Sequence, residues 1–131
     1  KVNIYFRENP TDDNYKTWFS FYADLYFTKS NAEAGKKMIL ADSACIKSFL
    51  AARSESSKKQ HLLTNINASK PRRLYLAGLE DKLLPTSVLE KDAKSGGFKY
   101  LTVKNAGHFV HFDQPKEVAE MISTFIKEGD I

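Results

Sequence analysis

One uninterrupted apolar segment constrains the fold more than any other feature of the chain. The run Leu74–Ala77 is apolar throughout, and Gly78 stops it. A short continuous run of this kind is typical of a strand that is covered on both faces, as in a parallel sheet. The sequence therefore predicts a buried strand that needs neighbouring strands.

A helix and a second strand follow closely. Pro85 suits the first turn of a helix, and Ser95–Gly97 suits its end. Phe98–Val103 is predicted to be the second strand. Strand, helix and strand within about thirty residues form a βαβ unit, with parallel strands and a right-handed crossover. The predicted fold class is α/β.

The remaining segments predict helices. A last helix opens at Pro115 and keeps an apolar face as far as Ile126. Near the start, Thr11 can cap a helix that carries an aromatic stripe, which is expected to be core and not pocket lining. The stripe is Tyr15, Trp18, Phe19, Tyr22 and Tyr26. Further predictions are helices over Ala32–Leu40, Ala44–Ala52 and Lys58–Ile66 and a short strand over Lys1–Arg7.

Composition excludes several classes of protein. With 42% hydrophobic and 12% aromatic residues the chain is globular, and the scattered basic doublets behind its net charge of +4 do not form a nucleic-acid groove. No apolar run approaches the roughly eighteen residues of a membrane span. The one cysteine, Cys45, excludes an internal disulfide and fits a reducing, cytoplasmic compartment.

The chemistry is expected at the carboxyl ends of the two strands, where parallel sheets gather their functional groups. Asp81 follows the first strand and His108 follows the second. Neighbouring strands lie about 4.8 Å apart, so these loops can bring the carboxylate to the imidazole. That contact would fix the tautomer of the histidine and stabilise its protonated form. A turn aspartate and a packed histidine are the competing interpretations, and Glu80 is an equal candidate for the acid.

A metal site is a further alternative in the same loop. His111 lies three residues after His108, and Asp113 follows it as a third possible ligand. The segment has no H-E-x-x-H pattern, so a packing or supporting role for His111 is preferred, and no metal or cofactor is expected.

The strings GLEDKLLP and NAGHFVHFDQPKEVAEMISTFI together resemble the C-terminal part of the α/β-hydrolase fold family. In that family a late strand ends in a G-x-x-D-x-x-x-P loop that holds the acidic member of a catalytic triad, and the next strand ends in a G-H loop. The resemblance implies that Asp81 is the acid and His108 the general base. It also implies that residues 1–68 are a cap-like helical segment and residues 69–131 the end of the hydrolase core. With a cap in that place, the aromatic stripe around Trp18 would instead form part of a substrate wall.

The nucleophile of such a triad is missing from the sequence. It usually lies in a G-x-S-x-G turn, and none of the six glycines frames a serine in that way. The chain, which begins at Lys1, is therefore interpreted as the C-terminal half of a hydrolase of ester-like, epoxide or carbon–halogen bonds in a small-molecule substrate. It would be inactive alone, and would pair with the missing N-terminal half or with another copy. The alternative is a non-catalytic interaction module on the same scaffold.

Overall fold

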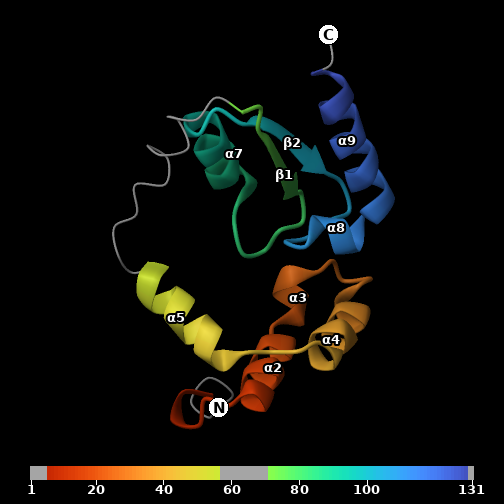
Figure 1. Ribbon diagram of the computed structural model, residues 1–131. Helices are drawn as coiled ribbons and strands as arrows, with labels where there is room; N and C mark the ends of the chain where they lie inside the picture. Colours follow the sequence, from red (N-terminus) through yellow and green to blue (C-terminus); the bar gives the residue numbers. More distant parts are fainter. Residues whose placement is uncertain (1–5, 57–70, 130–131) are drawn as a thin grey trace.

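The computed structural model describes residues 6–56 and 71–129 (Figure 1). The predicted helix Lys58–Ile66 and most of the predicted strand Lys1–Arg7 lie outside these residues. Among the described residues the elements are α2 (Asp12–Phe21), α3 (Ala23–Tyr26), α4 (Ala32–Ala41), α5 (Ile46–Ser56), β1 (Leu74–Gly78), α7 (Thr86–Ser95), β2 (Lys99–Val103), α8 (Val110–Asp113) and α9 (Pro115–Lys127).

Local signals account for the helices of the first half. Thr11 is extended (φ −106°, ψ 164°), and its hydroxyl accepts a hydrogen bond from the backbone N–H of Asn14, which caps α2 as predicted. The strand predicted over Lys1–Arg7 is wrong where it can be compared, because Phe6 and Arg7 are helical. The ring of Phe6 is buried and stacks on Trp18 with 5.2 Å between centroids. Packing against an aromatic helix face thus outweighs the apolar alternation.

The βαβ unit forms as predicted. β1 and β2 pair in parallel, with Leu74 opposite Lys99 and Gly78 opposite Val103. The crossover helix α7 begins one residue after Pro85, which is its N-cap. Gly97 then turns the chain towards β2 with a positive φ of 68°, a conformation that glycine adopts without strain. Mixed helices and a small parallel sheet make the chain α/β.

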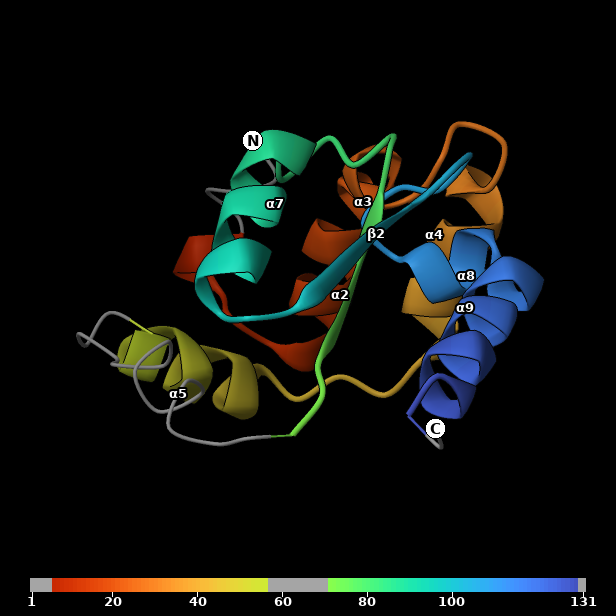
Figure 2. The same ribbon diagram turned by 90° about the horizontal axis from the view of Figure 1, so that it is seen from above.

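Helices cover both sides of the two strands. Figure 2 shows α7 and α9 on opposite sides of them. Buried Leu89 and Ala93 lie on α7, and Val118 of α9 packs with Val103 and Ala106. α9 opens at Pro115 as predicted, with the four-residue helix α8 just before it. Within the two described ranges, none of these helices has both the length and the apolar character to cross a membrane.

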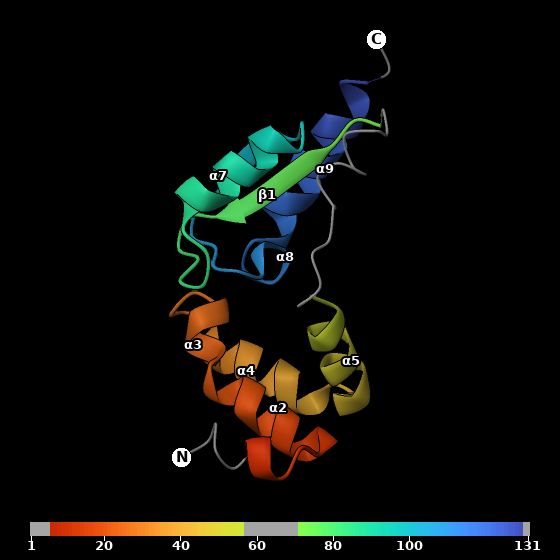
Figure 3. The same cartoon turned by 90° about the vertical axis from the view of Figure 1, so that its left-hand side faces the viewer.

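The first half of the chain packs against the loop that follows β2. Figures 1 and 3 show α2–α5 gathered together, with α3 next to α8. The joint is formed by Phe27, which is 1% exposed and lies between the rings of Phe109 and Phe112, at centroid distances of 5.2 and 4.9 Å. A buried aromatic joint of this kind holds the histidine loop against the helical half.

Candidate active site

The loops after β1 and β2 bring an aspartate and a histidine together. His108 Nδ1 lies 2.9 Å from Asp81 Oδ2. The loops themselves are joined by backbone hydrogen bonds, from Leu79 N to Val103 O (3.0 Å) and from Glu80 N to Ala106 O (2.9 Å). The parallel pairing of the strands therefore fixes the distance between the two side chains.

The carboxylate of Asp81 is held from both sides. Its Oδ1 accepts hydrogen bonds from the backbone N–H groups of Leu83 (2.8 Å) and Leu84 (3.1 Å). The side chain is only 3% exposed. Because Oδ1 is occupied, Oδ2 is turned to the imidazole. Glu80, the other candidate for the acid, is exposed, so the partner of His108 is Asp81.

The ring of His108 has one side for the carboxylate and one side free for chemistry. An ionised carboxylate only accepts hydrogen bonds, so Nδ1 carries the hydrogen and Nε2 keeps its lone pair. The ring is 32% exposed and lies near Tyr26 and Phe109, with centroid distances of 5.8 and 5.6 Å. Burial raises the pKa of Tyr26, so its phenol is neutral. This arrangement suits a general base whose protonated form Asp81 would stabilise.

Asp113 anchors the histidine loop to the first half of the chain. The residue is buried, and Oδ2 accepts a hydrogen bond from Gly107 N at 2.8 Å. Its carboxylate also accepts from Thr28 N (3.2 Å), Thr28 Oγ1 (3.0 Å) and Asn31 Nδ2 (2.8 Å). These four donors occupy the oxygens that the metal hypothesis needed. In the part of the chain that the structure describes, no three His, Cys, Asp or Glu residues are grouped to hold a metal ion.

The sequence offered no correct role for Asp113. It suggested the residue only as a metal ligand. Its position beside the G-H pair, as one acidic residue among aromatic ones, is a signal for a buried anchor. Its partners Thr28 and Asn31 give no such signal, because the chain separates them from it by more than eighty residues.

The histidine loop approaches other backbone segments too closely for side chains. Phe109 N donates to Tyr26 O at 3.1 Å. A Cβ atom at Gly107 would lie 2.8 Å from Tyr26 O, and one at Gly78 would overlap the backbone oxygen of Gly107. Both contacts are closer than real Cβ atoms allow, so glycine is required where β1, α3 and the loop meet.

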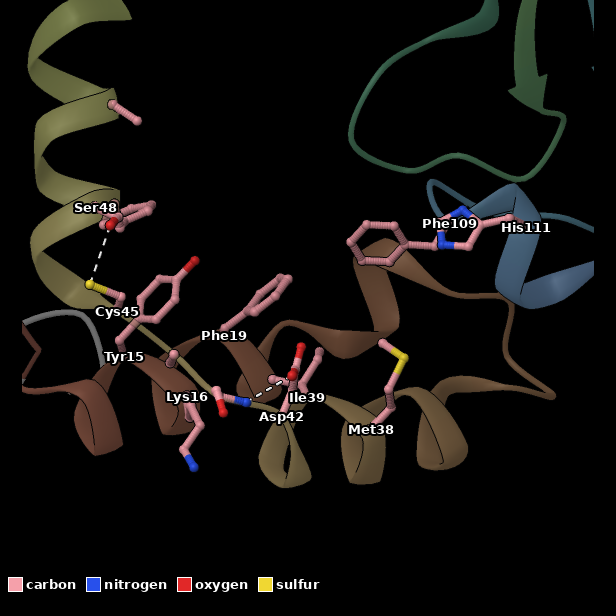
Figure 4. A pocket seen from close by; sticks show the side chains of 14 residues that line it. Tyr15, Lys16, Phe19, Met38, Ile39, Asp42, Cys45, Ser48, Phe109 and His111 are labelled. Carbon is pink, nitrogen blue, oxygen red and sulfur yellow. Dashed lines mark hydrogen bonds between the residues drawn. The ribbon is translucent and has the colours of Figure 1, made fainter.

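A cavity of about 670 Å³ includes Phe109 and His111 of the histidine loop in its lining, but neither His108 nor Asp81. α2, α4, α5 and the histidine loop line it, and Figure 4 shows the rings of Tyr15 and Phe19 across from Phe109 and His111. The aromatic stripe that begins on α2 was predicted to be core, but only part of it packs in the interior. Trp18 packs against Phe6, whereas Tyr15 and Phe19 line the cavity together with residues of α4 and α5.

Comparison with known families matched residues 28–128 of the 131-residue chain to the family described as serine carboxypeptidase. The match begins at Thr28, so it includes α4 and α5 as well as both loops of the Asp81–His108 pair. It is therefore wider than the region from residue 69 onwards that carried the resemblance in the sequence. No curated protein and no solved structure matched the chain.

Proposed function

Because the chain belongs to the serine carboxypeptidase family, we propose that it supplies the acid and the base of a serine hydrolase that releases the C-terminal residue of a peptide. His108 is the general base and Asp81 orients it. The observation that carries the proposal is the 2.9 Å contact between His108 Nδ1 and the buried Asp81 carboxylate. The resemblance to the end of an α/β-hydrolase core points to the same two residues.

In this mechanism His108 carries one proton in each half of the cycle. A serine hydroxyl gives its proton to Nε2 as its oxygen attacks the peptide carbonyl carbon. Asp81 stabilises the imidazolium that results. The imidazolium then gives the proton to the leaving amine as the C–N bond breaks, and the acyl group stays on the serine. In the second half of the cycle a water molecule gives a proton to the same histidine as its oxygen attacks the acyl carbon, and the imidazolium returns that proton to the serine oxygen as the C–O bond breaks and the acid is released.

The family description favours one of the reactions that the sequence left open. The name of the matched family specifies a serine nucleophile. Hydrolysis through an acyl-serine intermediate is therefore favoured over epoxide and carbon–halogen hydrolysis, which would use a carboxylate nucleophile. That serine has to come from outside these 131 residues, since no G-x-S-x-G turn occurs among them. We therefore propose that residues 1–68 are a cap-like segment and residues 69–131 the end of the core of a longer enzyme.

The test is mutation of the pair in a full-length parent enzyme. His108→Ala should lower kcat by about 10⁴-fold or more, because loss of the base disables the triad as a unit. Asp81→Asn should also be severe, because an amide cannot hold the imidazolium. Glu80→Gln is the matched control, as Glu80 is exposed and not the partner of His108. The substrate is a blocked dipeptide with a free C-terminal carboxylate, compared with its C-terminal amide.

Three outcomes would contradict the proposal. If Glu80→Gln were severe and Asp81→Asn mild, the acid would be wrongly assigned. If His108→Ala kept most of its activity, the base would be wrongly assigned. Equal cleavage of the dipeptide and its amide would reject the carboxypeptidase specificity and leave the hydrolase mechanism standing.

A further inference from the structure

We propose that Tyr26 is a positioning residue, which holds the imidazole of His108 in the orientation that a general base needs. The role of the imidazole as a base rests on the proposed function, whereas the packing of the two rings does not. Tyr26 is the last residue of α3 and lies two residues before the segment that matches the family, so the match does not include it.

The short helix α3 contacts both loops of the candidate pair. Lys82, which directly follows the acid, donates from Nζ to Asp24 O at 2.9 Å. On the other loop Phe109, which directly follows the base, donates from its backbone N–H to Tyr26 O at 3.1 Å. The second of these bonds brings the side chain of Tyr26 to the histidine.

The ring of Tyr26 packs against the imidazole of His108. Their centroids are 5.8 Å apart and their planes are inclined by 74°. Phe109 stacks on Tyr26 with 5.5 Å between centroids and 17° between planes, and it meets the imidazole at 65°. Phe19 of α2 packs edge-on against Tyr26 at 4.7 Å and supports it from the helical half. The imidazole therefore meets a supported aromatic surface in the edge-to-face arrangement that aromatic pairs prefer.

The hydrogen bond to Asp81 does not fix the plane of the imidazole by itself. The bond joins Nδ1 to Oδ2 at 2.9 Å, and a ring that is 32% exposed could still rotate about the line between these atoms. A displacement of about 1 Å at a reacting group can lower a rate by about 100-fold. Contact with Tyr26 limits this rotation, so Nε2 keeps one direction.

The ring of Tyr26, and not its hydroxyl, carries this role. Within the described ranges, no other residue is hydrogen-bonded to the hydroxyl. Tyr26→Phe should therefore keep the role and Tyr26→Ala should lose it, although the alanine still offers its backbone oxygen to Phe109. Tyr22→Ala is the matched control, because Tyr22 is half-buried like Tyr26 but its ring contacts Trp18 and Phe21.

NMR of the 131-residue chain measures the state of the imidazole directly. Long-range proton–nitrogen spectra distinguish the two tautomers of a histidine at mildly alkaline pH, where imidazole is neutral. The original chain, Tyr26→Phe and Tyr22→Ala should show His108 with its hydrogen on Nδ1. Tyr26→Ala should show a mixture of both tautomers, because a rotating ring loses its bond to Asp81 for part of the time.

Kinetics of the full-length parent enzyme measure the effect on catalysis. With the blocked dipeptide as substrate, Tyr26→Ala should lower kcat by about ten-fold or more and leave KM within about two-fold. This split is expected because the ring orients the base and does not bind the substrate. Tyr26→Phe should restore kcat, and Tyr22→Ala should not lower it.

Four results would overturn the proposal. They are a mixture of tautomers in the original chain, a single tautomer in Tyr26→Ala, equal losses in Tyr26→Ala and Tyr22→Ala, and a raised KM with unchanged kcat in Tyr26→Ala. Tyr26→Leu, which keeps apolar volume without a flat ring, replaces the alanine variant if that variant does not fold, and it should also give mixed tautomers.

The NMR measurement does not require a nucleophile. Its failure would therefore reject the positioning role of Tyr26 alone. An active His108→Ala parent would instead reject the base of the proposed function, whatever the tautomer in the isolated chain.

Discussion

At the scale of single residues, an exposed thiol stands out beside the cavity. Cys45 is exposed, and the Ser48 hydroxyl that donates to its Sγ is the main reason that the pKa of the thiol is lowered. Desolvation and the charge of Asp12 act in the opposite direction and are weaker. The thiolate is the reactive form, so this hydrogen bond makes Cys45 reactive at lower pH than an ordinary cysteine.

Replacing Ser48 tests this effect. Ser48→Ala removes the donated hydrogen bond, so the pKa of Cys45 should rise and its reaction with a thiol reagent should need higher pH. The measurement is the rate of thiol modification against pH. Ser43→Ala is the control, because Ser43 also lines the cavity while its hydrogen bond to Asp42 is donated by its backbone N–H. If the pH dependence of Cys45 modification were unchanged in Ser48→Ala, the Ser48 hydroxyl would not be the cause of the lowered thiol pKa.

At the scale of elements, α8 carries the link between the halves of the chain. Asp113, its last residue, joins the histidine loop to the turn at Thr28 and Asn31. A buried carboxylate with four donors stabilises the fold only while all four keep an acceptor. Removing its charge should therefore affect both the stability of the chain and the position of His108.

We expect Asp113→Asn to lower the free energy of unfolding by about 2–3 kcal/mol, because the new amide donors would face backbone N–H groups in a buried site. Urea unfolding measures the loss, and Asp24→Asn on the exposed surface of α3 is the control. Thr28→Val should be coupled to Asp113→Asn in a double-mutant cycle. Additive effects of the two substitutions would show that the bond from Thr28 contributes nothing to stability.

The elements that the sequence predicted well are those with signals in their own residues. Thr11, Pro115 and Gly97 mark boundaries by capping or by backbone conformation, and the structure places the boundaries there. The strand order predicted that the loop after β1 would meet the loop of His108, and the resemblance to the hydrolase family selected Asp81 over Glu80 as the acid. The helix α8 was missed because four residues give no periodicity. The cavity and the hydrogen bonds of Asp113 depend on how distant segments pack against each other. No pattern of neighbouring residues in the sequence predicts that packing.

At the scale of the whole molecule, several large apolar side chains remain exposed on the described elements. Leu79 after β1 and Val88 on α7 are 49% and 47% exposed. On α9, Ile122 and Ile126 are 42% and 59% exposed, although they lie on the face predicted to be apolar. Among the described residues the sheet has two strands, which leaves edges with unpaired N–H and C=O groups.

The chain should therefore be found paired across the strand nearest Leu76, with a second copy or with the N-terminal half of the proposed parent. Such pairing supplies the missing hydrogen bonds and covers apolar surface. Light scattering at low protein concentration measures the state, and the unfolding midpoint should rise with concentration. A stable monomer with a cooperative transition independent of concentration would contradict this expectation.

The isolated chain should also lack catalysis. Without a serine in a G-x-S-x-G turn, His108 and Asp81 have no nucleophile to activate, so hydrolysis of a p-nitrophenyl ester should not exceed that of free imidazole at the same concentration. Rates with and without the chain settle the question. Activity above that level that His108→Ala abolishes would mean that a nucleophile exists within these residues.

The anchor formed by Asp113 also has a consequence for the order in which the protein folds. The βαβ unit is assembled from contacts between residues close in the chain, which form early because little loop entropy opposes them. The bonds from Thr28 to Asp113 span 85 residues, so they close late. Until they close, the histidine loop keeps its local bond from Gly107 N to Asp113 but is not fastened to the helical half. The anchor between the histidine loop and the helical half would thus form after the Asp81–His108 contact, and it would be lost when the helical half detaches.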